Sequence, residues 1–295
     1  MNHITLPISK SIANRILLLQ TIHGDPLFGV SADMPDDVRI LHDALQTLRD
    51  NDQRPLTLHL GNCGTALRFL QVHLAQRYPG EQIVLDGDPR LKERDGKPTS
   101  QTSSALLMHG IEVTDHSPYV AMTRSVIASY PNVPIERDWS AAAFWYEYVA
   151  IHGGELLLEG LTDSSLQGDR IVADIYAEHF GVTTTFTTEG ALIVKDIERR
   201  LNVNCQLSFV NCPDLYPAIA LTCERLGIRL NATGTERLRY KECDRLEAVA
   251  RHETRHDHRM AMALLVAGFP VDDTDCIRKS YPLFIEQWNT KIMKA

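Results

Sequence analysis

The hydrophobic positions of the chain occur in short runs, and their spacing separates predicted helices from predicted strands. Val38, Leu41, Leu45 and Leu48 recur every three or four residues, the period that places them on one helix face. Residues 155–159 form a short apolar run after two glycines, which is typical of a strand. Further strands are predicted over 56–60, 82–87, 133–136, 183–188, 191–194, 206–210 and 229–233. Further helices are predicted over 66–76, 141–151, 166–180 and 215–226.

Polar residues fall between these runs in a repeated order: a strand, then a cluster of charged or hydroxyl-bearing residues, then a helix. This order predicts an α/β fold in which several helix N-termini can converge. Convergence would gather many cations around two carboxylates, and such a pocket would take a substrate with several negative charges. The residues expected there are Lys10, Arg15, Arg68, Arg90, Lys241, Arg245, Arg259 and Lys279, with the carboxylates Asp214 and Glu242.

The first polar cluster, Ser9–Arg15, precedes the apolar run Ile16–Leu19 and is predicted to begin a helix. Ser9 or Ser11 can act as the N-cap. Free backbone N–H groups and the helix dipole favour an anion at this end, and the neighbouring lysine and arginine strengthen that preference. The alternative is a solvated helix start with ordinary capping.

Other clusters leave similar alternatives open. Gly61–Thr65 lies at a strand-to-helix junction, where glycine lets the backbone approach an anion closely, although a single G-x-x-G is weak evidence. The basic run Asp88–Arg94 is either part of an anion site or a solvated surface. Asp214 follows Pro213 at a predicted helix start, so its carboxylate is either a helix cap or one of the two carboxylates embedded in the cationic pocket.

Composition and charge limit the possible functions. The chain has 295 residues, 44% of them hydrophobic, which is enough for one large domain or two of ordinary size. Lys and Arg number 30 against 38 Asp and Glu, and a net charge of −8 argues against general binding of nucleic acid or anionic membranes. The six cysteines form no C-x-x-C pair, and we find no signal peptide or membrane-spanning run. We therefore expect a cytoplasmic protein with reduced cysteines.

Seven of these polar clusters together resemble the 5-enolpyruvylshikimate-3-phosphate synthase family, the enolpyruvyl transferases of the shikimate pathway. They occur in the family's order and span most of the chain. Each is moderately specific by itself, but seven in sequence are hard to obtain by chance. They are Ser9–Arg15, Leu60–Arg68, Gly87–Arg94, Pro213–Asp214, Lys241–Arg245, Asp257–Met262 and Lys279–Pro282.

The resemblance implies an α/β fold of two similar domains, each built of βαβαββ units around buried helices. The expected domains are 6–181, on the shikimate 3-phosphate side, and 182–295, which residues 1–5 would join. The implied reaction transfers the enolpyruvyl group of phosphoenolpyruvate to the 5-hydroxyl of shikimate 3-phosphate and releases phosphate, in aromatic amino-acid biosynthesis. The family needs no metal or organic cofactor, and we expect a monomer that binds neither nucleic acid nor membrane.

The resemblance also implies roles for individual residues. Asp214 would take the 5-hydroxyl proton, while Glu242 and Lys10 would handle the proton at the enolpyruvyl methylene. His258 and Lys241 would support the site. Shikimate 3-phosphate would meet Ser11, Arg15, Ser100 and Gln101, and Asn62 would bind substrate. Phosphoenolpyruvate would be held by Lys10, Gly64, Arg90, Arg245, Arg259 and Lys279.

The chain departs from the family pattern in two ways. Connecting stretches are shorter than in the family between residues 94 and 100, 127 and 133, and 251 and 256, so helices or strands are expected to be missing there. Residues near the expected shikimate ring also differ: Phe144 replaces a tyrosine, Ala141 and Ala143 replace serines, and Arg237 replaces an asparagine. A shortened, inactive relative that only binds phosphorylated ligands is therefore an alternative function.

Two further alternatives are weaker. His252–His256 matches H-E-x-x-H, in which two histidines one helical turn apart bind zinc, but it has charged flanks and lacks a clear third ligand. An incidental polar connector is the simpler interpretation. The related transferase that acts on a UDP-sugar fits less well, because Ser9–Arg15 and Asp257–Met262 match the shikimate enzyme better.

Overall fold

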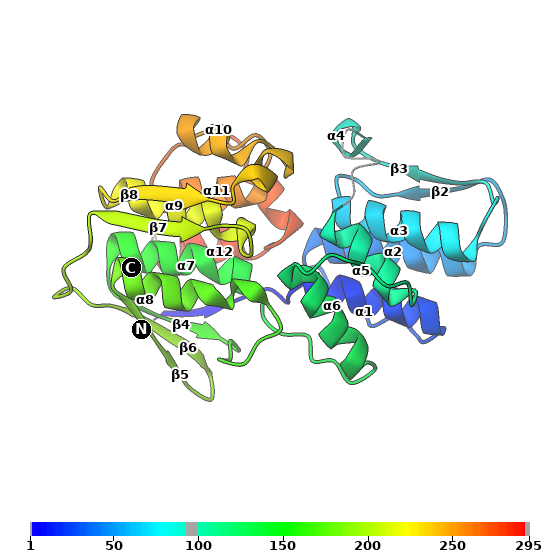
Figure 1. Cartoon of the computed structure of the whole chain (residues 1–295), viewed down its shortest axis with the longest axis horizontal. Helices are drawn as coiled ribbons and strands as arrows, with labels where there is room; N and C mark the ends of the chain where they lie inside the picture. Colours follow the sequence, from blue (N-terminus) through cyan, green and yellow to red (C-terminus); the bar gives the residue numbers. More distant parts are fainter. Residues whose placement is uncertain (1, 93–98, 293–295) are drawn as a thin grey trace. The chain divides into compact units, whose positions relative to one another are not determined.

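The computed structural model describes residues 2–92 and 99–292 of the chain (Figure 1). Contacts between Cα atoms divide it into two compact units, here called unit 1 (Met1–Pro7 with Glu136–Ala295) and unit 2 (Ile8–Ile135). This division differs from the expected boundary near residue 181, which falls inside unit 1. Residues 1–7 and 182–295 do share one unit, but residues 136–181 belong to it as well.

Unit 1 contains a four-stranded sheet with the order β1-β4-β6-β5. Strand β1 (Asn2–Thr5) is parallel to β4 (Glu155–Glu159), and β6 (Gly190–Lys195) is antiparallel to both β4 and β5 (Val182–Phe186). The helices α7 (Trp139–His152) and α8 (Val172–Phe180) complete this region. With residues 8–135 set aside, the elements follow one another as β-α-β-α-β-β.

Helix α7 forms the centre of unit 1. Its sequence is apolar on every face, and such a helix is stable only when it is buried all round. It packs against α8, α9 (Tyr216–Arg225), α11 (His258–Val266) and strands of the four-stranded sheet. Its N-terminus is fixed by the Asp138 carboxylate, which accepts a hydrogen bond from the backbone N–H of Ala141 at 3.0 Å.

The second sheet of unit 1 has two parallel strands, β7 (Asn204–Ser208) and β8 (Arg229–Thr233), joined by α9. One face packs inward through Cys205 and Leu230, whereas the other carries exposed polar side chains. The remaining elements of this unit are α10 (Arg245–Arg251), α12 (Phe284–Gln287), η1 (Gly168–Ile171), η2 (Pro213–Leu215), η3 (Glu236–Tyr240), η4 (Asp275–Lys279) and η5 (Trp288–Ile292).

Unit 2 is mostly helical around a small parallel sheet of β2 (Leu56–His59) and β3 (Ile83–Asp86). The predicted apolar stripe of Val38, Leu41, Leu45 and Leu48 lies on α2 and is buried. The helices of this unit are α1 (Lys10–His23), α2 (Asp36–Asp50), α3 (Gly64–Arg77), α4 (Pro89–Lys92), α5 (Ser100–Met108) and α6 (Pro118–Ser129). Across residues 2–92 and 99–292, no helix is long and apolar enough to cross a membrane.

One predicted strand is wrong. Residues 133–136 form irregular backbone, with a single bridge residue at Arg137. Pro134 has no N–H to donate to a neighbouring strand, so it interrupts the ladder that the apolar residues around it suggest. The Glu136 side chain instead accepts a hydrogen bond from the backbone N–H of Leu166 at 2.9 Å. The segment therefore connects the chain to the cap of α7.

Candidate active site

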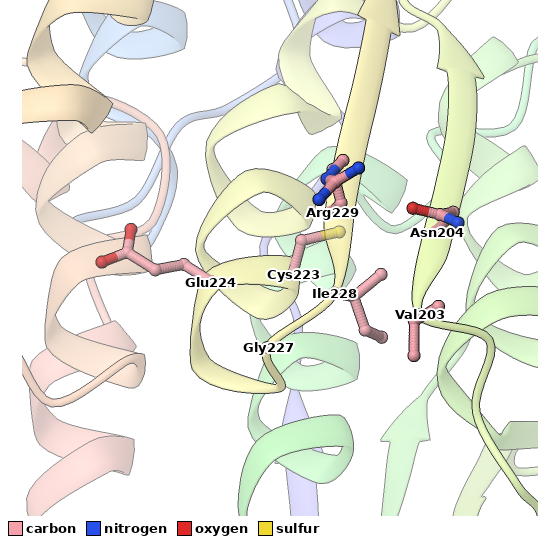
Figure 2. Close-up of a pocket in the computed structure, with 7 residues that line it drawn as sticks. All are labelled: Val203, Asn204, Cys223, Glu224, Gly227, Ile228 and Arg229. Carbon is pink, nitrogen blue, oxygen red and sulfur yellow. The ribbon is translucent and has the colours of Figure 1, made fainter.

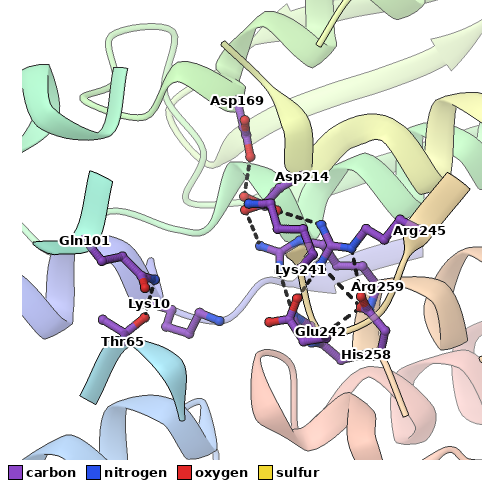
Figure 3. A network of polar contacts seen from close by, with 12 residues as sticks. Lys10, Thr65, Gln101, Asp169, Asp214, Lys241, Glu242, Arg245, His258 and Arg259 are labelled. Carbon is purple, nitrogen blue, oxygen red and sulfur yellow. Dashed lines mark hydrogen bonds and ion pairs between the residues drawn. The ribbon is translucent and has the colours of Figure 1, made fainter. Parts of the chain in front are cut away.

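Arg245 joins three carboxylates in the interior of unit 1, at the first residue of α10. Its side chain is fully buried, and each of its guanidinium nitrogens donates to a different acid at 2.8 Å: Nη1 to Asp214, Nη2 to Glu242 and Nε to Asp257. Asp214, Glu242 and Arg245 of this network are labelled in Figure 3. A buried guanidinium is stable only when its N–H groups find acceptors and its charge finds an opposite charge, and these acids supply both.

Asp214 is the carboxylate most surrounded by cations. Besides Arg245, the Lys241 Nζ lies 3.2 Å from its Oδ1 and the Arg259 Nη2 lies 3.1 Å from its Oδ2. Burial favours the neutral acid, but the three cations outweigh it and hold the pKa of Asp214 well below its usual range. The result is a buried carboxylate that stays ionised and can accept a hydrogen bond from a hydroxyl.

The site forms because three helix N-termini meet. Asp214 lies in η2, which leads directly into α9. Asp244 caps α10 by accepting from the backbone N–H groups of Leu246 and Glu247, and Asp257 caps α11 by accepting from Arg259 N at 2.9 Å. The predicted convergence of helix starts is thus present within unit 1. Of the residues expected in the pocket, it brings together Asp214, Lys241, Glu242, Arg245 and Arg259.

His258 supports this cluster from within α11. It is fully buried, and its Nε2 lies 2.7 Å from Nη1 of Arg259. Because a guanidinium can only donate, Nε2 is the acceptor and the neutral ring carries its proton on Nδ1. That nitrogen faces the Asp257 carboxylate at 3.8 Å. Lys279, the remaining predicted residue of unit 1, ends η4, which packs against α11.

The predicted residues of unit 2 form a separate set. Arg15 is buried, and its guanidinium donates to Thr123 Oγ1 (2.7 Å), Ser104 Oγ (3.0 Å) and the carbonyls of Ser11 and Tyr119. Burial lowers its pKa to about 10. Arg15 therefore ties α1 to α5 and α6, in addition to any role in substrate binding.

Most of the other residues of this set lie at helix starts. Lys10 is the first residue of α1, where its Nζ pairs with the buried Asp37 at 2.9 Å. Ser9 occupies the predicted N-cap position but makes no side-chain capping bond. Gly64 opens α3, preceded by Asn62 in a turn. Ser100 opens α5.

Two residues of unit 2 interact with neighbouring side chains. The Gln101 amide donates to Thr65 Oγ1 at 2.7 Å and accepts from Arg68 at 3.0 Å, which ties α5 to α3. Arg90 pairs with both carboxylate oxygens of Asp88 at 2.9 and 3.0 Å. Glu93 and Arg94 of the predicted basic run lie outside the described residues, as does most of the shortened stretch that follows.

The residues that depart from the family pattern lie in core and surface positions. Ala141, Ala143 and Phe144 are buried in α7, and the Phe144 ring meets the ring of Phe284 edge-on at 6.3 Å. Arg237 is exposed in η3.

Asp169 belongs to this region, although the sequence predicts only a helix start there. It is buried in η1 and accepts a hydrogen bond from Ser140 Oγ on α7. Its carboxyl points toward Asp214 in Figure 3. Burial and the charge of Asp214 raise its pKa to about 7. An acidic residue at a helix start usually indicates capping, so the sequence held no signal for this contact.

The H-E-x-x-H sequence does not have the geometry of a zinc site. Helix α10 ends at Arg251, and His252 and His256 adopt left-handed backbone conformations with φ of 54° and 57°. His252 pairs with Glu224 and His256 with Asp273. Within residues 2–92 and 99–292, no group of three His, Cys, Asp or Glu side chains could hold a metal ion. The sequence is a polar connector.

A cavity of about 410 Å³ lies at the opposite end of α9 (Figure 2). It is lined by the start of β7 and the turn from α9 into β8, including Asn204, Cys223, Glu224 and Arg229. None of the predicted site residues lines it.

Sequence comparisons identify the relatives of this chain. A profile of the EPSP synthase family (3-phosphoshikimate 1-carboxyvinyltransferase) matches residues 111–252 and 249–288. A 3-phosphoshikimate 1-carboxyvinyltransferase of Bacteroides fragilis is 27% identical over 399 residues, covering 97% of this chain and 93% of the relative. The enzyme of the same name from Methanopyrus kandleri is 30% identical, covering 81% of this chain and 71% of the relative.

The first of these alignments is longer than the chain itself, 399 positions against 295 residues, so the relative carries segments that this chain lacks. The two regions that match the family profile span the positions of the Asp214 cluster. The chain belongs to the EPSP synthase (3-phosphoshikimate 1-carboxyvinyltransferase) family.

Proposed function

We propose that this protein transfers the enolpyruvyl group of phosphoenolpyruvate to the 5-hydroxyl of shikimate 3-phosphate and releases phosphate. The observation that carries the proposal is the buried Asp214 carboxylate, held ionised by Lys241, Arg245 and Arg259 in a chain of this family. Both substrates are anions, and a site built from cations at helix N-termini suits them.

In this proposal Asp214 accepts the 5-hydroxyl proton as the addition step begins. Glu242 and Lys10 then handle the proton at the enolpyruvyl methylene as the tetrahedral intermediate forms and breaks down. Arg259 is suited to bind phosphoenolpyruvate, since guanidinium groups pair bidentately with carboxylate and phosphate.

Arg245 has a different position from the other cations. All its guanidinium nitrogens already donate to acids of the protein, so binding phosphoenolpyruvate would require it to exchange one of those bonds. Its main contribution in the proposed reaction is to hold Asp214 and Glu242 in fixed positions.

The remaining substrate contacts are proposed from the positions at which this sequence matches the motifs of the family. Phosphoenolpyruvate is proposed to bind Lys10, Gly64, Arg90 and Lys279 as well, and shikimate 3-phosphate to bind Ser11, Arg15, Asn62, Ser100 and Gln101. We propose that the enzyme works as a cytoplasmic monomer of two βαβαββ-based domains. The six cysteines are free thiols, which supports a reducing compartment.

Release of inorganic phosphate from phosphoenolpyruvate, measured with and without shikimate 3-phosphate, tests the reaction. We expect release only with both substrates. Asp214→Asn should lower kcat by roughly 10² to 10⁴-fold, because it removes the proton acceptor while keeping the shape of the side chain. Asp174→Asn, at an exposed position of α8, is the matched control and should leave kcat unchanged. Equal rates in Asp214→Asn and the wild type would contradict the proposal.

The shortened chain favours one alternative, an inactive relative that binds phosphorylated ligands. The observation behind it is the alignment with the Bacteroides fragilis enzyme, which contains many positions that this chain lacks. Calorimetry with shikimate 3-phosphate separates the two functions. Binding without any phosphate release in folded protein would support the alternative.

A further inference from the structure

Asp169 is a buried acid beside the proposed base. It lies in η1, just before α8, and only 5% of its surface is exposed. The Ser140 hydroxyl of α7 donates to its Oδ2, and its carboxyl faces Asp214 (Figure 3). Burial next to another carboxylate is unfavourable for a charged acid, so this placement needs an explanation.

Charged groups from several elements act on Asp169. Asp214 in η2 and Asp138 at the start of α7 oppose its ionisation, while Arg259 in α11 and the Ser140 hydroxyl favour it. Burial, and then the negative charge of Asp169, raise the pKa of the neighbouring Cys212 thiol. Burial is the largest influence, and together these raise the pKa of Asp169 to about 7.

The ion pairs of the cluster join three cations to three carboxylates, and Asp169 takes part in none of these pairs. The cations are Lys241, Arg245 and Arg259, and the carboxylates are Asp214, Glu242 and Asp257. Ionisation of Asp169 would add an unmatched negative charge to the region that is proposed to receive two anionic substrates.

We propose that Asp169 is a positioning residue that acts through Asp214: on the acid side of neutrality it retains a proton, so that it adds no negative charge beside Asp214 and the cluster still accepts anions. This inference rests on the proposed function for its consequence, but the protonation of Asp169 itself is a property of the folded protein. When Asp169 ionises, its charge opposes anion binding and increases the proton affinity of Asp214.

Carboxyl titration by NMR tests the proton without reference to activity. In protein labelled with ¹³C at aspartate Cγ, we expect one resonance that titrates near the pKa of about 7 given above and is missing in Asp169→Asn. Asp214→Asn should shift that titration to lower pH, because it removes the opposing charge. Ser140→Ala should shift it to higher pH, because it removes a donor to the ionised acid. Asp174→Asn should leave this titration unchanged.

A resonance of Asp169 that titrates in the ordinary range, or that is unaffected by Asp214→Asn, would overturn the proposal. Ser140→Ala deletes a single hydroxyl, so it reports on the titration of Asp169 even if Asp169→Asn fails to fold. None of these outcomes depends on whether the protein turns over substrate, so failure of the proposed function remains separate.

Kinetics then test the consequence. Between about pH 6 and about pH 8.5, the KM for phosphoenolpyruvate should rise about tenfold more in the wild type than in Asp169→Asn. Tenfold is the expected effect of one charge at roughly 10 Å in a medium of effective dielectric about 20. Comparing the two proteins removes the titration of the substrate phosphates, which occurs near pH ~6. Parallel KM profiles would contradict the effect on anion binding, because a purely structural role would not change the pH dependence.

Discussion

Arg245 and Arg15 are both buried arginines that the sequence predicts as substrate ligands, yet the two units hold them differently. In unit 1, Arg245 donates to three carboxylates, which keep its pKa well above its usual range. In unit 2, Arg15 donates to hydroxyl and carbonyl oxygens, and burial lowers its pKa to about 10.

This difference shows that burial alone does not define the electrostatic role of an arginine. Neutral oxygens satisfy the donors of Arg15 but leave its charge uncompensated, so an anionic ligand would gain from pairing with it. The carboxylates around Arg245 compensate its charge already. Arg245 therefore organises acids, while Arg15 retains electrostatic attraction for a phosphate.

The largest expected effect is that of Arg245→Met. It leaves three buried acids without their shared cation, and breaking a buried ion pair in this way costs about 3–5 kcal/mol. Because Trp139, Trp145 and Trp288 all lie in unit 1, urea unfolding followed by tryptophan fluorescence reports on this change. Arg251→Met, on the exposed side of α10, should have little effect. Equal destabilisation by Arg245→Met and Arg251→Met would contradict the role of Arg245 as the shared cation of buried acids.

Arg15→Met should cost less, about 1–3 kcal/mol. It leaves hydroxyl and carbonyl groups with fewer partners, but it removes an uncompensated buried charge at the same time. Thr123 keeps its bonds to Ser104 and to the Tyr119 carbonyl, which limits the loss. Unit 2 contains no tryptophan, so amide hydrogen exchange across α1, α5 and α6 is the suitable measurement. Exposed Arg124→Met on α6 is the control; a loss as large as that of Arg245→Met would show that neutral partners are not the weaker arrangement.

Buried acids show the same contrast between compensated and uncompensated charge, and Glu147 is the uncompensated case. It is fully buried in α7, and among residues 2–92 and 99–292 its carboxyl oxygens have no hydrogen-bond partner. Burial raises the pKa of Glu147 well above the usual range, opposite to the shift of Asp214. Both acids belong to unit 1, so the cations around Asp214, not the unit, keep that acid ionised.

Glu147→Gln should change the pH dependence of stability, and over a single pH unit this effect is the smallest of the three. Since folding raises the pKa of Glu147, the folded state binds more protons above the pKa of the unfolded chain, and its stability falls as pH rises. The wild type should lose about 1.4 kcal/mol per pH unit relative to the variant until the native pKa is reached. Apparent Tm measured across this range checks the slope. Glu189→Gln, in an exposed turn, should leave it unchanged.

The local sequence pattern was sufficient to predict most of the helices and strands and the residue types of the site. Residues 155–159 and 229–233 form strands as predicted, and the polar clusters do precede helices, because apolar period and capping residues act over a few positions. Pro134 shows the limit: the apolar pattern around it predicted a strand that its missing N–H does not support.

The protonation states and contact partners of the site residues could be established only from the tertiary structure. The sequence by itself determined that Asp214, Arg245 and Arg15 sit at or near helix starts, since that depends on neighbouring residues. Only the fold decided that three cations surround Asp214, that Arg15 meets hydroxyls from α5 and α6, and that Asp169 faces Asp214. These contacts join residues far apart in the chain, and the pKa of each group follows from the charges and burial that those contacts create.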